Sequence, residues 1–167
     1  MSSAFNTFRA GLPPPAECLA IGVGCMELTL FGLAGLLNPI EFAKGFGVPM
    51  VTPSSADLEA GGALEGATIQ EKQRSEKVQN TQSAYVAAIA ARNLQNGVLL
   101  LVFGCYLRDR RALGYAVAAG VVATVSDAVI CSAYGLPDAI FGHLFGVCNS
   151  VLIGGSLLYW GRYDPLW

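Results

Sequence analysis

Four ionisable side chains lie inside long apolar stretches of this sequence: Glu27, Arg92, Asp127 and His143. Such groups are costly in lipid, and they usually face a protein interior or a water-filled cavity. A carboxylic acid and an imidazole that face each other can exchange protons with a bound molecule. A nearby guanidinium can hold an enolate, a phenolate or a carboxylate. These residue types therefore suit acid/base chemistry on a small molecule.

The apolar stretches have the length of membrane-spanning helices. Hydrophobic residues make up 53% of the 167 residues, charged residues only 13%, and the mean hydropathy is +0.49. A soluble domain usually carries about 25% charged residues, and a span needs about 20 mostly apolar ones. We expect spans at 16–37, 85–107, 112–134 and 139–160. The sequence predicts a single integral membrane domain over 1–167 that is all-α, a polytopic membrane four-helix bundle.

Two segments outside the spans carry separate expectations. The polar residues 50–84 are expected to form a solvated loop with at most one helical turn. The start of this connection, 38–49, mixes aromatic residues, glycines and charges, and it is expected to lie along the membrane interface as a short helix or turn.

Small residues recur at every fourth position of two spans, and the first span also contains glycines. They are Gly142, Gly146, Ser150 and Gly154 in the fourth span, Ala116, Gly120 and Thr124 in the third, and Gly24, Gly32 and Gly35 in the first. Such residues let helices approach closely in lipid. They predict packing within the bundle or, alternatively, a homo-oligomer interface.

The ionisable groups are predicted to lie at a common depth. At about 1.5 Å per residue, Arg92 and Asp127 are roughly 10 Å from helix ends on the same side. His143 is about 6 Å and Glu27 about 15 Å from that side. Two interpretations remain open. One is a structural Arg92–Asp127 ion pair that joins two helices, and the other is a polar pocket for a ligand or substrate.

The pocket interpretation assigns a role to each side chain. Asp127 and His143 form the pair that handles protons, and Arg92 is the electrostatic clamp. Four further residues are candidates for substrate binding: Asn96 as an orienting donor, Asn93, Tyr134 and Glu27, although Glu27 alone is more simply a protonated, hydrogen-bonded glutamic acid. One histidine is too few for a multi-histidine metal site, and no phosphate-binding loop is present. We expect no metal and no cofactor.

Charge and cysteine usage limit partners and sidedness. The net charge is −2 and the ten Lys and Arg are scattered, so no nucleic-acid partner is expected. The five cysteines form no CxxC motif and are interpreted as small hydrophobic residues. Expected partners are a lipophilic small molecule and membrane lipid. The compact arginine cluster at 108–111, together with Arg9 and Arg162, predicts that both termini are cytosolic.

Several short motifs resemble one known family. They are Asn38-Pro39, Phe46-Gly47-Val48-Pro49, Ala91-Arg92-Asn93-Leu94-Gln95-Asn96-Gly97, Arg110-Arg111-Ala112-Leu113-Gly114, Ser126-Asp127-Ala128 and Phe141-Gly142-His143. Together they resemble small integral membrane proteins of bacteria and filamentous fungi, known only as a domain of unknown function and similar in architecture to DoxX-like four-helix proteins. The resemblance covers roughly 16–160, apart from an insert around 52–81. The family's second helix carries an Arg-Asp pair, whereas Asn93 here replaces the acid.

The resemblance also implies a setting for the chemistry. Fungal members often look like accessory proteins of secondary-metabolite pathways, which implies an endoplasmic-reticulum protein acting on a polyketide or terpenoid. With the polar residues described above, this favours an acid/base cyclase or isomerase. Two alternatives remain open: a cofactor-free oxygenase of phenolic rings, and a non-catalytic scaffold or transport subunit.

Overall fold

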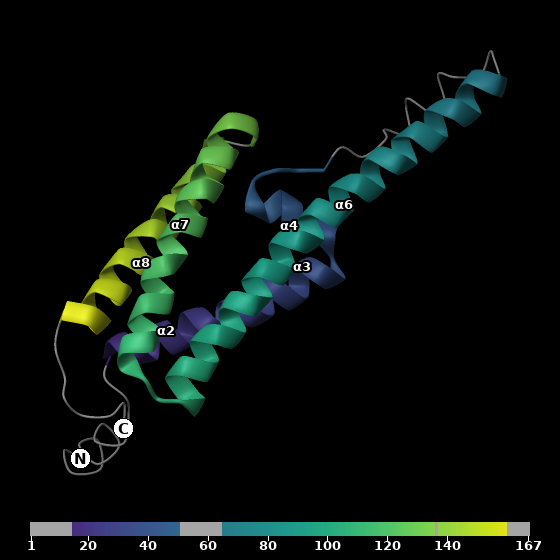
Figure 1. Cartoon of the computed structure of the whole chain (residues 1–167). Coiled ribbons are helices and arrows are strands. Elements are labelled where there is room, and N and C mark those ends of the chain that lie inside the picture. Colours follow the sequence, from purple (N-terminus) through teal and green to yellow (C-terminus); the bar gives the residue numbers. More distant parts are fainter. Residues whose placement is uncertain (1–14, 51–64, 136, 160–167) are drawn as a thin grey trace, which may run out of the picture.

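All regular elements of the described chain are helices (Figure 1). The structure is a computed structural model that describes residues 15–50, 65–135 and 137–159. Four of its helices are long and apolar enough to cross a membrane: Pro15–Leu37, Gln73–Tyr106, Arg110–Tyr134 and Pro137–Tyr159. The predicted all-helical fold with four spans is therefore confirmed, and the chain is a multi-pass membrane protein.

The first span changes its helical geometry partway along. Helix α2 (Pro15–Met26) continues into the π-helical segment η1 (Glu27–Leu33) and then into the short α3 (Ala34–Leu37). A proline at the first turn starts α4 (Pro39–Phe46), where its missing N–H costs nothing. Gly47 ends α4 with a left-handed φ of 98°. The expected short helix after the first span is thus present.

Helix α6 (Glu65–Leu101) is much longer than expected and continues into the π-helical η2 (Val102–Tyr106). The predicted polar loop over 50–84 is wrong from residue 65 onward, while 51–64 lie outside the described residues. Residues 67–84 contain no glycine or proline and are rich in Glu, Lys, Gln and Ala, which favour helix. The adjoining span also removes the cost of helix nucleation. The prediction of a loop failed because it relied on the polarity of these residues and not on their helix propensity.

With 37 residues, α6 is about 55 Å long, and its polar first half extends away from the other helices in Figure 1.

Helices α7 (Arg110–Tyr134) and α8 (Ile140–Tyr159) form an antiparallel pair, joined through the short 3-10 helix η3 (Pro137–Ala139) (Figure 1). The Asp109 carboxylate caps α7 by accepting from the backbone N–H groups of Arg111 at 2.9 Å and Ala112 at 3.0 Å. Arg9, Arg162 and residue 160 of the predicted fourth span lie outside the described residues.

Several of the small residues lie at close helix–helix contacts, which confirms the predicted packing within the bundle. A Cβ on Gly24, Gly32 or Gly35 would meet an atom of α6 within 3.0 Å, so the first span lies directly against α6. In the α7–α8 pair, the four-residue pattern holds at Gly154, which faces the Ala118 backbone, and at Gly146, which faces Thr124. Gly142 has no atom within 4 Å at its Cβ position and instead lines a cavity.

The apolar core lies between the helices on one side of that cavity. Its buried members are Ala20, Leu100, Leu113, Val117, Ile153 and Leu157. They come from α2, α6, α7 and α8, so each long helix contributes to the same core. Because each long helix contributes to this core, the core fixes how each helix is rotated about its own axis. In that rotation the polar side chains face the inside of the bundle.

Candidate functional site

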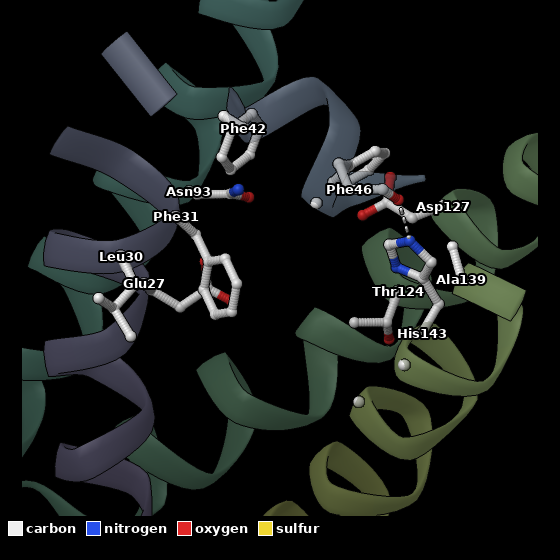
Figure 2. A pocket seen from close by; sticks show the side chains of 13 residues that line it. Glu27, Leu30, Phe31, Phe42, Phe46, Asn93, Thr124, Asp127, Ala139 and His143 are labelled. Atoms are coloured by element: carbon white, nitrogen blue, oxygen red, sulfur yellow. Dashed lines mark hydrogen bonds between the residues drawn. The ribbon is translucent and has the colours of Figure 1, made fainter. Parts of the chain in front are cut away.

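A cavity of about 460 Å³ lies among α4, α7, α8 and the π-helical η1 (Figure 2). Its volume falls within the usual range of small-molecule sites, about 300–1,000 Å³. Its walls combine a few polar side chains with aromatic and aliphatic ones. The lining residues are Glu27, Leu30, Phe31, Phe42, Gly45, Phe46, Asn93, Thr124, Asp127, Ala139, Gly142, His143 and Gly146.

Arg92 of α6 and Asp127 of α7 form a two-pronged ion pair beside this cavity. The Nη2–Oδ2 distance is 2.7 Å and the Nη1–Oδ1 distance is 3.1 Å. Nη2 also donates to Oδ1 of Asn93 at 3.3 Å. Asp127 and Asn93 are buried, whereas 41% of the Arg92 side chain is exposed. The expected meeting of residues 92 and 127 is therefore present, and both oxygens of Asp127 are occupied by it.

His143 is oriented by the backbone at the end of α4. Its Nε2 lies 3.0 Å from the carbonyl oxygen of Phe46 and 3.2 Å from Sγ of Cys131. The imidazole ring also packs edge to face against the Phe46 ring, with the ring centroids 4.8 Å apart. The Cys131 thiol is also 3.4 Å from the same carbonyl. A carbonyl can only accept, so Nε2 carries the proton. In Figure 2 the other ring nitrogen, Nδ1, points toward Thr124 and the cavity, where its lone pair can act as a base.

Glu27 enters the cavity from the first residue of η1, across from the α7 and α8 side chains (Figure 2). Asn96 lies near its carboxyl group, and both residues line the smaller cavity described below. The Oε2 atom is buried and has no hydrogen-bond partner among the described residues. Because π-helical segments inside α-helices are frequent at functional sites, the position of Glu27 supports a role in ligand contact.

A second cavity of about 280 Å³ adjoins the larger one, and both residues of the ion pair line it. It shares Glu27, Asn93, Thr124 and Asp127 with the larger cavity, so these four residues form a common wall. Arg92 and Asn96 line only the smaller cavity.

One proposed binding residue lies away from both cavities. Tyr134 is 82% exposed and lines neither of them. It shares a helix face with Asp127, but it is the last residue of α7 and lies about 10 Å further along the axis. The assignment of Tyr134 to substrate binding therefore has no support from the geometry.

Sequence reasoning missed the contribution of α4 and of small polar side chains. Phe46 supplies both an aromatic wall and the carbonyl that orients His143, and Thr124 belongs to the shared wall. Cys131 contacts His143 although it was interpreted only as a small hydrophobic residue. The one available signal was the glycine at position 47, which follows a short aromatic segment as a helix-ending residue would.

A second buried ion pair lies at the opposite end of the bundle and was also missed. Nε of Arg110 is 2.9 Å from Oε1 of Glu17, and Arg110 Nη2 donates to the carbonyl of Ser156 at 3.0 Å. Glu17 is only 1% exposed. The pair joins the starts of α2 and α7 to the end of α8, and the apolar core separates it from the cavities. Arg110 is therefore more than part of a surface arginine cluster.

The contact between α4 and His143 depends on Gly47. Its φ of 98° is unfavourable for other residues, and a Cβ there would overlap that of Ala139. We expect Gly47→Ala to displace the end of α4 and uncover Cys131. In a chain whose other four cysteines are replaced by alanine, labelling of Cys131 by a maleimide should accelerate at least about tenfold. Gly45→Ala is the matched control, because a Cβ at Gly45 has open space. Equal labelling rates in the two variants would refute the role of Gly47 in holding the end of α4 over Cys131.

Comparison with known protein families gives a match over most of the chain. The family's description is Domain of unknown function (DUF4267), and it matches residues 25–157. No curated protein and no solved structure matches. The matched segment includes both residues of the Arg92–Asp127 ion pair, as well as His143, Glu27 and all of α4.

Proposed function

We propose that this chain, which belongs to the DUF4267 family of domains of unknown function, binds a lipophilic metabolite within the membrane and isomerises or cyclises it by proton transfer. One observation carries the proposal. A largely apolar cavity holds a carboxyl oxygen without a partner, on Glu27, and an imidazole nitrogen that faces the cavity, on His143. An apolar cavity with a few placed polar groups is the usual form of a small-molecule site.

The proposed roles differ from those expected from sequence, because Glu27 replaces Asp127 as the proton-transfer partner of His143. His143 Nδ1 removes a proton from a carbon next to a carbonyl, or from a hydroxyl group, of the bound molecule. The Phe46 carbonyl stabilises the resulting imidazolium through the Nε2 proton. Glu27 returns a proton at a second position, so atoms and electrons balance without a redox change. Asp127 is engaged by Arg92 on both oxygens, and it serves as a positioning residue.

Substitution of the two proton-transfer groups tests this function. Glu27→Gln and His143→Gln keep the size and hydrogen-bonding ability of each side chain, so the protein should melt in detergent as the wild type does. Loss of the acid or the base should reduce product formation about 100-fold or more. The readout is the metabolite profile of a host that makes the pathway product, in which the compound that accumulates identifies the substrate. Glu41→Gln, on the exposed side of α4, is the matched control.

Isotopes and stability distinguish the proposal from its alternatives. An isomerase or cyclase working by proton transfer places deuterium from D₂O on a carbon of its product, whereas an oxygenase incorporates labelled O₂. Unchanged metabolites in both variants would remove the catalytic assignment. Unchanged metabolites together with a large loss of stability would instead assign the polar groups a purely structural role.

For the compartment, we propose the endoplasmic reticulum membrane, with both termini on the cytosolic side. For the metabolite, we propose a fungal polyketide or terpenoid. The support is the exposed Arg108 and Arg111 at the α6–α7 connection, the end of the bundle where α2 starts and α8 ends. Glycosylation tags at each terminus should remain unmodified, while a tag inserted after Val48 should be glycosylated. Modified terminal tags would reverse this topology.

A further inference from the structure

The smaller cavity contains hydrogen-bond donors that the ion pair leaves unused. A guanidinium has five N–H groups, and three of those on Arg92 are directed to Asp127 and Asn93. The Nε–H and one Nη1–H have no hydrogen-bond partner among the described residues. Arg92 lines this cavity, and its side chain is 41% exposed. An N–H group without an acceptor is costly inside a membrane, so these donors favour a ligand oxygen.

The surrounding charges favour a neutral oxygen over an anion. The carboxylate of Asp127 already compensates the charge of Arg92. Glu27 lies in the wall that both cavities share, as the proton-donating and therefore uncharged acid of the proposed reaction. A carboxylate or phosphate placed beside Arg92 would have to compete with the Asp127 carboxylate for the same positive charge and would be repelled by it. A carbonyl or hydroxyl oxygen can accept the same hydrogen bonds without adding charge.

The remaining walls of the smaller cavity are apolar and leave open space. Leu99, Leu100 and Val117 form one part of them. Gly120 lines the cavity without filling it, since a Cβ there would have only Ser150 Oγ nearby, at 3.7 Å. Because four residues line both cavities, the two spaces adjoin, and rotation of one of these shared side chains would let a flexible molecule held in the larger cavity place a substituent beside Arg92.

We infer that the smaller cavity recognises a neutral carbonyl or hydroxyl oxygen of a lipophilic ligand whose carbon skeleton occupies the larger cavity. This inference rests on the proposed binding function and specifies the chemical class of its ligand. Arg92 donates to the oxygen and Asn96 lines the same space, so the ion pair has a recognition role in addition to joining α6 and α7. The expected ligand is an apolar ketone or alcohol rather than a fatty acid or a phospholipid headgroup.

Competition for a photoreactive probe tests the inference on the purified full chain in detergent. The probe is a long-chain alkane bearing a diazirine, and mass spectrometry locates labelled peptides that line the larger cavity. Three competitors of equal chain length are compared: a methyl ketone, the alkane and the fatty acid at neutral pH. A hydrogen bond to a charged donor should make the ketone compete about tenfold better than the alkane. We expect the carboxylate to have no such advantage.

Two matched glycine substitutions assign the effect to one cavity. Gly120→Val fills the smaller cavity and should abolish the tenfold advantage of the ketone while the alkane still competes. Gly142→Val fills the larger cavity, where a Cβ meets no atom within 4 Å, and should reduce competition by every compound. Ala119→Leu, which also projects from the wall of the smaller cavity, replaces Gly120→Val if that variant does not fold.

The outcomes separate this inference from the proposed function. Equal competition by ketone and alkane, a stronger effect of the fatty acid, or a ketone advantage that persists in Gly120→Val and Ala119→Leu would overturn the recognition role. These results would leave binding in the larger cavity intact. Failure of all three compounds to compete in the wild type would instead remove the proposed binding function, and the inference with it.

Discussion

Asp127→Leu should lower the stability of the protein in detergent by about 3 kcal/mol. The substitution removes both carboxylate oxygens that accept from Arg92 and leaves a guanidinium without its counter-charge between α6 and α7. An unpaired charge in a membrane-spanning segment is more costly than an apolar pair of the same size. The expected measurement is a fall in the melting temperature of the purified chain, with earlier aggregation on heating.

A double variant distinguishes the cost of the unpaired charge from the loss of the pair itself. Arg92→Met combined with Asp127→Leu removes both charges while keeping apolar volume, so most of the lost stability should return. If the double variant is as unstable as Asp127→Leu alone, the pair contributes through its specific geometry. If Asp127→Leu melts as the wild type does, Arg92 does not form an ion pair with Asp127 inside the bundle. The placement of Asp127 in the wall between the two cavities would then be wrong.

Gly97→Val should disrupt the contact between the first span and α6. A Cβ at this position would lie 2.5 Å from the backbone nitrogen of Leu28 and 2.8 Å from the carbonyl oxygen of Gly24. Both are backbone atoms, so neither can move aside as a flexible side chain would. The helices must separate at this crossing, and we expect a loss of about 3 kcal/mol with visible misassembly in detergent.

Gly22→Val is the matched control for this second prediction. Gly22 lies on α2 near the same crossing, but a Cβ there meets no atom within 4 Å. Its melting temperature should stay close to that of the wild type, because valine replaces glycine in a helix without a clash. Equal behaviour of the two variants would show that the close approach of α2, η1 and α6 does not exist in the folded protein.

Counting residues from the helix ends was sufficient to predict that Arg92 and Asp127 lie at one level. Each helix rises by a constant amount per residue, and the apolar stretches define where each span ends. The same reasoning failed for residues 65–84, because polar composition was equated with a loop although Glu, Lys, Gln and Ala are good helix formers. Sequence reasoning also placed Tyr134 near the site, because residues seven apart lie on the same helix face. Tyr134, however, lies about 10 Å further along the helix axis than Asp127.

Composition and the lengths of the apolar stretches were enough to establish a helical multi-pass membrane protein and to predict that Arg92 and Asp127 lie at one level. These properties depend on the transfer of side chains into lipid and on a regular helical rise, and both can be read locally. The contacts of His143 with the Phe46 carbonyl, and of Glu17 with Arg110, join residues that are far apart along the chain. They depend on how each helix is rotated and on how closely glycines let the helices approach. Only the packed bundle establishes such distances, because no single segment contains both partners.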